Sequence, residues 1–231
     1  MQGEVFRRRR LPHWDVPGAI YFVTACLQGS IPAQGLLDIQ TFREQMQKRP
    51  IPEGLSREEW KRRQGKLVLA HADSWLDQGM AVSHLRDPKL AEQVVQAVVH
   101  FAGQRYDLFS FAVMPSHFHW VFQPREDWIQ SLQSKNIKRT PRERIMHTLK
   151  LHTALECNKL LGAAGTFWQE ESFDHCVFDM EELGRIIDYV ERNPVQVGLC
   201  SAPEEWPSSS APERKAKQIP YQQPLLRGAG R

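Results

Sequence analysis

Hydrophobic and polar positions alternate most clearly in residues 113–122 (VMPSHFHWVF). Alternation with a period of two is typical of a strand, because successive side chains point to opposite faces of a sheet. The pattern predicts a strand whose aromatic residues lie on a buried face, while His117, His119 and Val121 lie on the other. Pro115 has no backbone N–H to give to a neighbouring strand, so we expect the chain to turn into this strand there.

The other elements are indicated by runs of β-branched and aromatic residues and by apolar residues at helical spacing. Strands are predicted at residues 19–27, 108–114 and 173–178, and two short ones at 66–70 and 80–85. Helices are predicted at residues 36–48, from residue 56 onward, and at 88–105, 140–161 and 180–192, with a helical turn at 128–132.

Capping signals define the ends of the later helices. Thr140 and Glu143 form a capping-box pattern at the start of the long helix, and Gly162 is placed to end it. Asn193 stands before Pro194, and a residue before proline disfavours helical geometry. We therefore expect the last helix to end at this pair.

The clear elements follow the order strand–helix–strand–strand–helix–strand, with one more helix at the end. This order predicts an α+β fold of the ferredoxin-like split βαβ type, with an antiparallel sheet, helices on one face and an additional C-terminal helix. We expect a basic arm at residues 1–17 and one domain at 18–206 with an extended segment at 31–86. A polar, proline-rich and flexible tail is expected at 207–231.

The last predicted helix carries a tyrosine beside its apolar stripe. The stripe consists of Leu183, Ile186, Ile187 and Val190. Tyr189 lies off the centre of this stripe, and Asn193 follows one turn later on the same side. Such a pair can face a cleft, or it can be a boundary tyrosine with an asparagine that caps the helix.

Composition restricts the class of protein. The 231 residues are 41% hydrophobic, which is sufficient for a buried core, and no apolar run of 18 residues predicts a membrane span. The four cysteines are far apart, with no C-x-x-C pair. This spacing argues against a zinc ribbon or a disulfide framework and favours a reducing cytoplasm.

Positive charge is concentrated in two places, although the net charge is only +3. One is the run Arg7, Arg8, Arg9 and Arg10. The other consists of Lys135, Lys138, Arg139, Arg142 and Arg144. Such clusters bind phosphates through counterion release, or they are solvated tails and helix faces.

The histidines, the tyrosine and the asparagine form a chemical inventory for phosphoryl transfer. Two imidazoles whose Cα atoms lie roughly 6.5–7 Å apart on one strand face can hold one divalent ion, with the amide oxygen of Asn193 as a third ligand. A phenol such as Tyr189 becomes an effective nucleophile when a metal or a base assists it. Two surface histidines are the alternative interpretation. A hydrolase that activates water would need carboxylate ligands or a general base near His117 and His119.

Several sequence blocks, in this order, resemble the REP-associated tyrosine transposases, relatives of the single-stranded DNA transposases with a His-hydrophobic-His motif. The blocks are residues 10–14 (RLPHW), 21–24 (YFVT), 113–119 (VMPSHFH), 167–175 (FWQEESFDH), 189–199 (YVERNPVQVGL) and 206–209 (WPSS). The resemblance covers most of the chain.

The resemblance implies a role for each candidate residue. His117 and His119 would be metal ligands, Asn193 would be the third ligand, and Tyr189 would be the nucleophile. The implied reaction is cleavage of single-stranded, hairpin-forming DNA through a 5′-phosphotyrosine intermediate, with Mg²⁺ or Mn²⁺ as cofactor. Arg7–Arg10 would bind this DNA. A bacterial cytoplasmic protein associated with the nucleoid, as a monomer or homodimer, is expected.

The sequence departs from the family pattern at two places. Ser116 stands where relatives usually carry asparagine, and the segment at 31–86 is longer than the minimal family core. Asp174 and His175 lie in a family-like block without an assigned role. A sequence-specific nucleic-acid-binding protein without turnover is the alternative function on the same fold.

Overall fold

The structure is a computed structural model, and it describes residues 5–8, 12–16, 18–77, 82–133, 139–170 and 172–225. For residues 5–8 and 12–15, and for Asp77 and Gln133, only the backbone is described. None of the helices in this described part of the chain is long and apolar enough to cross a membrane.

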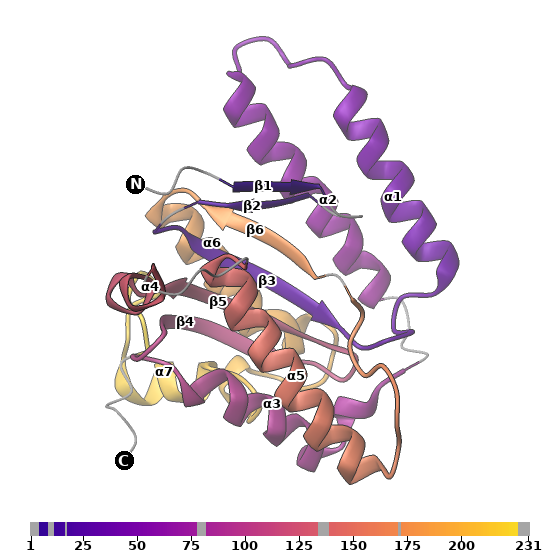
Figure 1. Ribbon diagram of the computed structural model, residues 1–231, viewed down its shortest axis with the longest axis vertical. Helices are drawn as coiled ribbons and strands as arrows, with labels where there is room; N and C mark the ends of the chain where they lie inside the picture. The colour runs from indigo at the N-terminus through magenta and orange to yellow at the C-terminus, as the bar shows by residue number, and fades with distance from the viewer. Residues whose placement is uncertain are drawn as a thin grey trace.

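The centre of the molecule is a four-stranded antiparallel sheet in the order β4-β5-β3-β6 (Figure 1). The strands are β3 (Ile20–Cys26), β4 (Tyr106–Val113), β5 (His117–Pro124) and β6 (Phe173–Val177). Between them lie α3 (Pro88–His100) and α5 (Pro141–Leu161), and α6 (Met180–Gln196) follows β6. The ferredoxin-like order of elements is confirmed.

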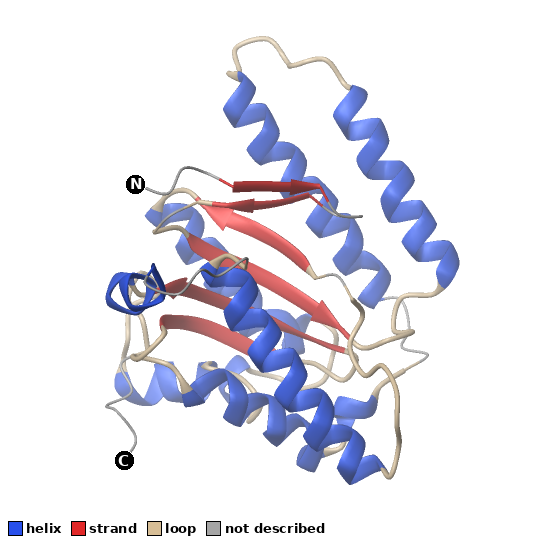
Figure 2. Ribbon diagram, viewed as in Figure 1, coloured by secondary structure: helices blue, strands red, loops and turns tan. Residues whose placement is uncertain are grey.

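Helices cover both faces of this sheet (Figure 2). On one face α3 and α5 pack on the aromatic side of β5, where Phe118, Trp120 and Phe122 are fully buried. On the other face α6 packs with Leu183 and Ile187, chiefly against β4 and also against β5. Alternation along β5 therefore separates the aromatic face from the histidine face, as its pattern predicts.

An additional helical hairpin extends the second face. It consists of α1 (Ala33–Lys48) and α2 (Arg57–Asp77), which confirm the helices expected at 36–48 and from residue 56 onward, although a short strand was also expected at 66–70. The prediction at 66–70 was wrong because the spacing of Leu69, Ala72 and Leu76 is helical, and these side chains are buried against the sheet. At 80–85, where the other short strand was expected, residues 80 and 81 lie outside the described part, residues 82 and 83 form no regular element, and a 3₁₀ turn (His84–Arg86) follows.

The last helix continues beyond the expected stop at residue 193. Pro194 lies inside α6, and the N–H groups of Val197 and Leu199 donate to the carbonyls of Asn193 and Pro194 at 3.2 and 2.8 Å. Asn193 and Pro194 are both buried, so packing outweighs the local preference of a pre-proline residue. The extra turn keeps Asn193 in helical geometry, one turn after Tyr189.

Residues 207–225 do not form the loose tail that their composition predicts. They run along the free edge of β4, where Val113 N–H donates to Ser208 O at 2.8 Å. A helix, α7 (Ala211–Lys217), then places Arg214 in a buried ion pair with Glu191 of α6 at 2.8 Å. These hydrogen bonds protect the edge of the sheet and fix α6 against β4. Residues 226–231 lie outside the described part.

The expected arm at residues 1–17 contains a β-hairpin. Its strands are β1 (Val5–Arg8) and β2 (Pro12–Asp15), paired with each other in a separate two-stranded sheet. β2 contacts β6, so the hairpin lies beside the outer edge of the main sheet (Figure 1). The predicted turn near residue 128 is a short helix, α4 (Glu126–Gln133).

Candidate active site

A tight turn places the two histidines at the start of β5. Met114 N–H donates to His117 O at 2.9 Å, so Pro115 and Ser116 form the whole connection between β4 and β5. His117 and His119 pair with β3, the next strand in the sheet. They lie on the α6 face of the sheet, both in β5, which is one of its two central strands.

The two imidazoles are held so that their Nε2 atoms meet, 3.1 Å apart. His117 Nδ1 is 3.0 Å from the hydroxyl of Ser116, and His119 Nδ1 is 2.9 Å from that of Thr24. Hydrogen bonds at Nδ1 orient a ring and leave Nε2 for a metal ion. Ser116, which departs from the family pattern, therefore provides the hydroxyl that orients His117.

Burial keeps both histidines neutral. His117 is 2% exposed and His119 is fully buried. Burial lowers the pKa of His117 to about 3, and burial together with the neighbouring His117 lowers the pKa of His119 well below its usual value. Neutral imidazoles keep the lone pair that binds a metal ion at physiological pH.

Tyr189 reaches this pair from α6. Its ring lies edge-on to His119, with the ring centroids 5.7 Å apart, and also contacts Phe22. Its hydroxyl donates to Asp73 Oδ2 at 2.8 Å and accepts from Asn193 Nδ2 at 3.3 Å. The structure thus brings Tyr189, His119 and Asn193 together within a single chain.

Asn193 has an unused acceptor. Its side chain is 1% exposed, and its Oδ1 is buried without a hydrogen-bond partner among the described residues. A buried amide oxygen without a partner is costly unless another group satisfies it. An amide oxygen without a partner is chemically suited to bind a metal ion.

The donor set fits a divalent ion. Adjacent ligands of an octahedral ion with bonds of about 2.1 Å are ~3.0 Å apart, close to the observed Nε2 separation of His117 and His119. Within the described residues no group of three or more His, Cys, Asp or Glu side chains could hold a metal ion. A site here would therefore consist of two imidazoles and the amide of Asn193, a set that favours Mn²⁺ over Mg²⁺.

Asp73 is the site residue that sequence reasoning missed. It lies on α2, is 6% exposed, and accepts the hydrogen bond of Tyr189. Its charge also raises the pKa of the nearby Cys26 thiol, after burial, which is the larger cause. From the sequence, Asp73 was expected in an acidic loop together with Asp77. The signal that could have placed it on a helix is the helical spacing of Leu69, Ala72 and Leu76 around it.

Asp174 and His175 have structural partners. Asp174 lies 3.6 Å from the buried guanidinium of Arg142 on α5. His175 Nε2 lies 2.8 Å from Glu182 Oε1 at the start of α6. Arg142, expected either in a phosphate-binding cluster or on a solvated helix face, is instead buried in the interior.

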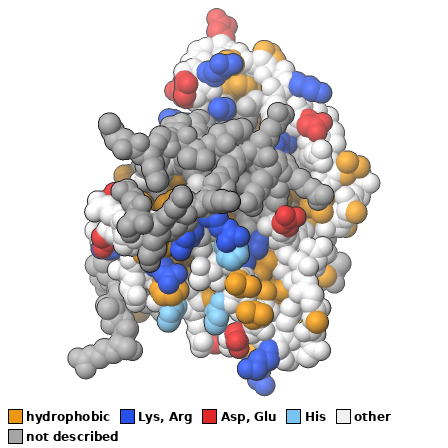
Figure 3. Space-filling model, in the orientation of Figure 1, with side chains coloured by type: hydrophobic (Ala, Val, Ile, Leu, Met, Phe, Trp, Pro, Cys, Tyr) orange, Lys and Arg blue, Asp and Glu red, His pale blue; other side chains and the backbone are white. Residues whose placement is uncertain are grey.

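The positions of the other basic residues are described only in part. Arg7 and Arg8 lie in β1, of which only the backbone is described, and Arg9 and Arg10 lie outside the described residues, as do Lys135 and Lys138. Lys, Arg and His side chains gather near the middle of the visible face, where α5 begins (Figure 3). Arg139 is exposed close to this helix start.

Comparison with known proteins supports the fold. No protein-family model matches the sequence, and no curated protein matches it. A solved structure of a REP-associated tyrosine transposase bound to a REP hairpin aligns with 95% of this chain and 92% of its own, with a TM-score of 0.50 and 13% sequence identity. At this identity the likeness shows that the chain has the α+β fold of such a transposase. The resemblance found in the motifs is confirmed at the level of the fold.

Proposed function

We propose that the protein is a metal-dependent endonuclease and strand transferase that acts on single-stranded, hairpin-forming DNA through a 5′-phosphotyrosine intermediate. The observation that carries this proposal is one cluster that contains a tyrosine, two convergent imidazoles and a buried amide oxygen without a hydrogen-bond partner among the described residues.

Each residue has one role in this reaction. His117, His119 and Asn193 hold a divalent ion, Mn²⁺ or Mg²⁺, which when bound polarises the scissile phosphate and neutralises charge in the transition state. Tyr189 is the nucleophile. Asp73 holds the phenolic hydroxyl in place by accepting its hydrogen bond. The same carboxylate oxygen can therefore take the phenolic proton when Tyr189 attacks.

The bonds change in a single in-line exchange. The Oη of Tyr189 forms a bond to phosphorus, and the bond from phosphorus to the 3′-oxygen of the preceding nucleotide breaks. Asp73 takes the phenolic proton, and the leaving 3′-oxygen takes a proton from solvent. The reverse attack by a 3′-hydroxyl on the phosphotyrosine rejoins strands and releases Tyr189.

The proposed substrate follows from the fold and from charge. The solved transposase of this fold is bound to a REP hairpin, and we propose that this chain also binds a DNA hairpin with a single-stranded flank. Arg7, Arg8, Arg9 and Arg10 are proposed to contact its phosphates. Tyr189 and both histidines come from the same chain, which supports chemistry in cis, and a location at the bacterial nucleoid in the cytoplasm fits such a substrate.

A covalent-adduct assay tests the proposal. The protein is incubated with Mn²⁺ and a DNA hairpin whose single-stranded flank is labelled at one end or the other. We expect a labelled protein band on a denaturing gel with only one of the two labels, because tyrosine retains only the 5′-phosphate side. Tyr189→Phe should abolish the adduct, whereas Tyr221→Phe, which removes another half-buried hydroxyl near α6, should retain it.

The other possible results identify the alternatives. Retention of the DNA on a native gel without any cleavage would support a binding protein without turnover. Cleavage without an adduct would support a hydrolase that activates water. Either result would contradict the proposed role of Tyr189.

A further inference from the structure

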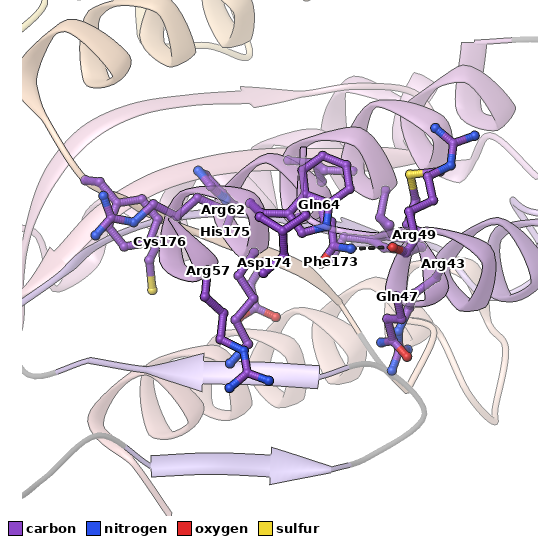
Figure 4. A pocket seen from close by; sticks show the side chains of 18 of the residues that line it. Arg43, Gln47, Arg49, Arg57, Arg62, Gln64, Phe173, Asp174, His175 and Cys176 are labelled. Carbon is purple, nitrogen blue, oxygen red and sulfur yellow. Dashed lines mark hydrogen bonds between the residues drawn. The ribbon is translucent and has the colours of Figure 1, made fainter. Parts of the chain in front are cut away.

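A cavity of about 460 Å³ lies between α1, α2 and the edge strand β6. Side chains of Arg43 and Gln47 from α1, Arg57 and Arg62 from α2, and Asp174 from β6 line it (Figure 4). Its volume is in the range of small-molecule sites. The α1–α2 hairpin, which the predicted core fold does not require, provides most of its wall.

The lining is strongly positive. Its cationic residues are Arg43, Arg49, Arg57, Lys61 and Arg62, and among the described residues that line it only Asp174 carries a carboxylate. Asp174 already lies 3.6 Å from Arg142. Arg49 and Arg57 form no ion pair with any residue that the structure describes. A cavity with this excess of guanidinium groups favours an anionic ligand, and phosphate above all.

The interior of the cavity is apolar and aromatic. Trp60, Phe173 and Leu69 line it, and the guanidinium of Arg62 lies 3.9 Å from the ring centroid of Phe178 at its wall. Trp60 is 8% exposed, and its Nε1 is buried without a hydrogen-bond partner among the residues described. A ligand that offers an oxygen or nitrogen acceptor beside an aromatic plane would satisfy this indole donor.

An aromatic surface inside a ring of cations is the combination that binds unpaired nucleotides, because the base stacks while the phosphate meets the charges. The cavity also lies close to the candidate active site. Gly65 and Leu69 line it, and Asp73, which holds Tyr189, is one turn after Leu69 on the same helix. On a helix with a rise of 1.5 Å per residue, Lys61 and Asp73 are ~18 Å apart, well within the length of strand that a single-strand binding site covers.

We propose that this cavity binds an unpaired nucleotide of the single-stranded flank next to the cleavage position, with the base against Trp60 and Phe173 and the phosphates against Arg57 and Arg62. The proposal rests on the proposed DNA substrate and adds a subsite that the α1–α2 hairpin builds. It makes this hairpin the part of the chain that selects the flank.

Binding assays with matched charge changes test the subsite. The variant Arg57→Gln/Arg62→Gln removes two exposed cations of the cavity, and Lys89→Gln/Lys159→Gln removes two exposed cations of α3 and α5. Fluorescence anisotropy is measured in chelator, so that no cleavage occurs, with a bare hairpin and with the same hairpin carrying a single-stranded flank. We expect the cavity variant to lose about 10-fold to 100-fold in affinity for the flanked hairpin, and to reduce its salt slope by ~1.4 because two single-strand phosphate contacts are lost.

The control variant should change the affinity for the flanked hairpin by less than about threefold, and the two variants should bind the bare hairpin alike. An equal loss in both variants, or an equal loss for both DNAs, would overturn the proposal. Trp60→Phe, which keeps the ring and removes Nε1, provides a second variant with a smaller expected loss.

Competition with a deoxynucleoside monophosphate separates a strand from a free nucleotide. The monophosphate should displace the flanked DNA only at concentrations far above those of the oligonucleotide; displacement at equal concentrations would identify a free-nucleotide site and overturn the proposal. The adduct assay is independent of this outcome. If wild type forms no adduct but the cavity variant loses affinity selectively, the catalytic proposal fails and the subsite stands. If wild type forms the adduct but the cavity variant shows no selective loss of affinity, the subsite fails and the catalytic proposal stands.

Discussion

The four-stranded sheet and the α1–α2 hairpin use polar side chains in opposite ways. In the sheet, His117 and His119 are buried and neutral, and each is fixed by a hydroxyl beside it. In the hairpin, the cations around the cavity are mostly exposed, and Asp73 is a carboxylate that reaches inward to Tyr189. Rigid, neutral ligands suit metal chemistry, and exposed cations suit recognition of a strand.

This contrast assigns different tasks to the two regions. The sheet and α6 hold the proposed metal ligands and the proposed nucleophile, and the hairpin supplies charge, an aromatic cavity and a contact to Tyr189. Changes in the sheet should therefore remove chemistry altogether. Changes in the hairpin should reduce rate or affinity without removing the metal site.

The largest effect is expected for the histidine pair. His117→Ala or His119→Ala should reduce adduct formation at least about 10³-fold, because a bound metal ion contributes several kcal/mol to the transition state. Both variants should also lose Mn²⁺ binding, measured by electron paramagnetic resonance of free Mn²⁺. His147→Ala, on the exposed side of α5, is the control and should keep both properties. Adduct formation at the wild-type rate without either imidazole would refute the metal site.

A stability effect of several kcal/mol is expected at the anchor of α6. Arg214→Met leaves the carboxylate of Glu191, which is 3% exposed on its side chain, without its ion partner. Removing one partner of a buried ion pair lowers the unfolding free energy by about 3–5 kcal/mol, and urea denaturation measures this loss. Lys217→Met on the exposed face of α7 should change stability by less than about 0.5 kcal/mol. Equal stability of the two variants would show that α7 does not hold α6.

The sheet and α6 were predictable because their signals are local and repeated. Alternation along β5 separates Trp120 from His119, and the stripe of α6 leaves Tyr189 at its border. In the hairpin, α1 and the start of α2 were predicted, but the second half of α2 was not, because its apolar face is sparse. Val68 and Leu69 in a short apolar run mimic a strand, and the helix becomes clear only with Leu76.

The convergence of Asp73 on the tyrosine could not be predicted from the sequence. It depends on a contact across 116 positions of the chain, which no local pattern encodes. The C-terminal segment shows the same limit, because its polar composition hides the buried pair of Arg214 and Glu191. A polar residue whose partner lies on a distant element has no local signature.

A smaller effect on catalysis is expected for the hairpin's contact to the site. Asp73→Asn keeps an acceptor for Tyr189 but removes the carboxylate proposed to take its proton, so adduct formation should fall about 100-fold. Mn²⁺ binding should not change, which separates this variant from those of the histidines. Asp38→Asn, in the same hairpin but bonded to His71 and Trp75, is the matched control and should form adduct normally. An unchanged rate in Asp73→Asn would place the hairpin outside the chemistry.

The smallest effect is a pH dependence of stability that should come from the sheet. In the metal-free protein the pKa of His117 is about 3, below its usual value of 6.5, and that of His119 is also lowered, in both cases chiefly by burial. The unfolded chain therefore binds protons that the folded chain does not. Stability should be independent of these groups above pH 6.5 and should fall below it, by up to about 1.4 kcal/mol per pH unit for each histidine.

Urea denaturation in chelator at several pH values between 6.5 and 5 measures this slope above the range where carboxylates titrate. Glu182, for example, contributes below its ordinary pKa of 4.5: burial alone would raise that pKa, but hydrogen bonds from His175, Lys66 and the N–H of Phe178 lower it to about 2. In His117→Gln the side chain is neutral at every pH. The unfolding free energy of this variant should therefore change less steeply with pH than that of wild type, by about the contribution of one histidine. If the slopes are the same, acid sensitivity does not arise at the buried pair, and the contrast between a neutral, buried metal site and a charged, exposed hairpin loses its electrostatic basis.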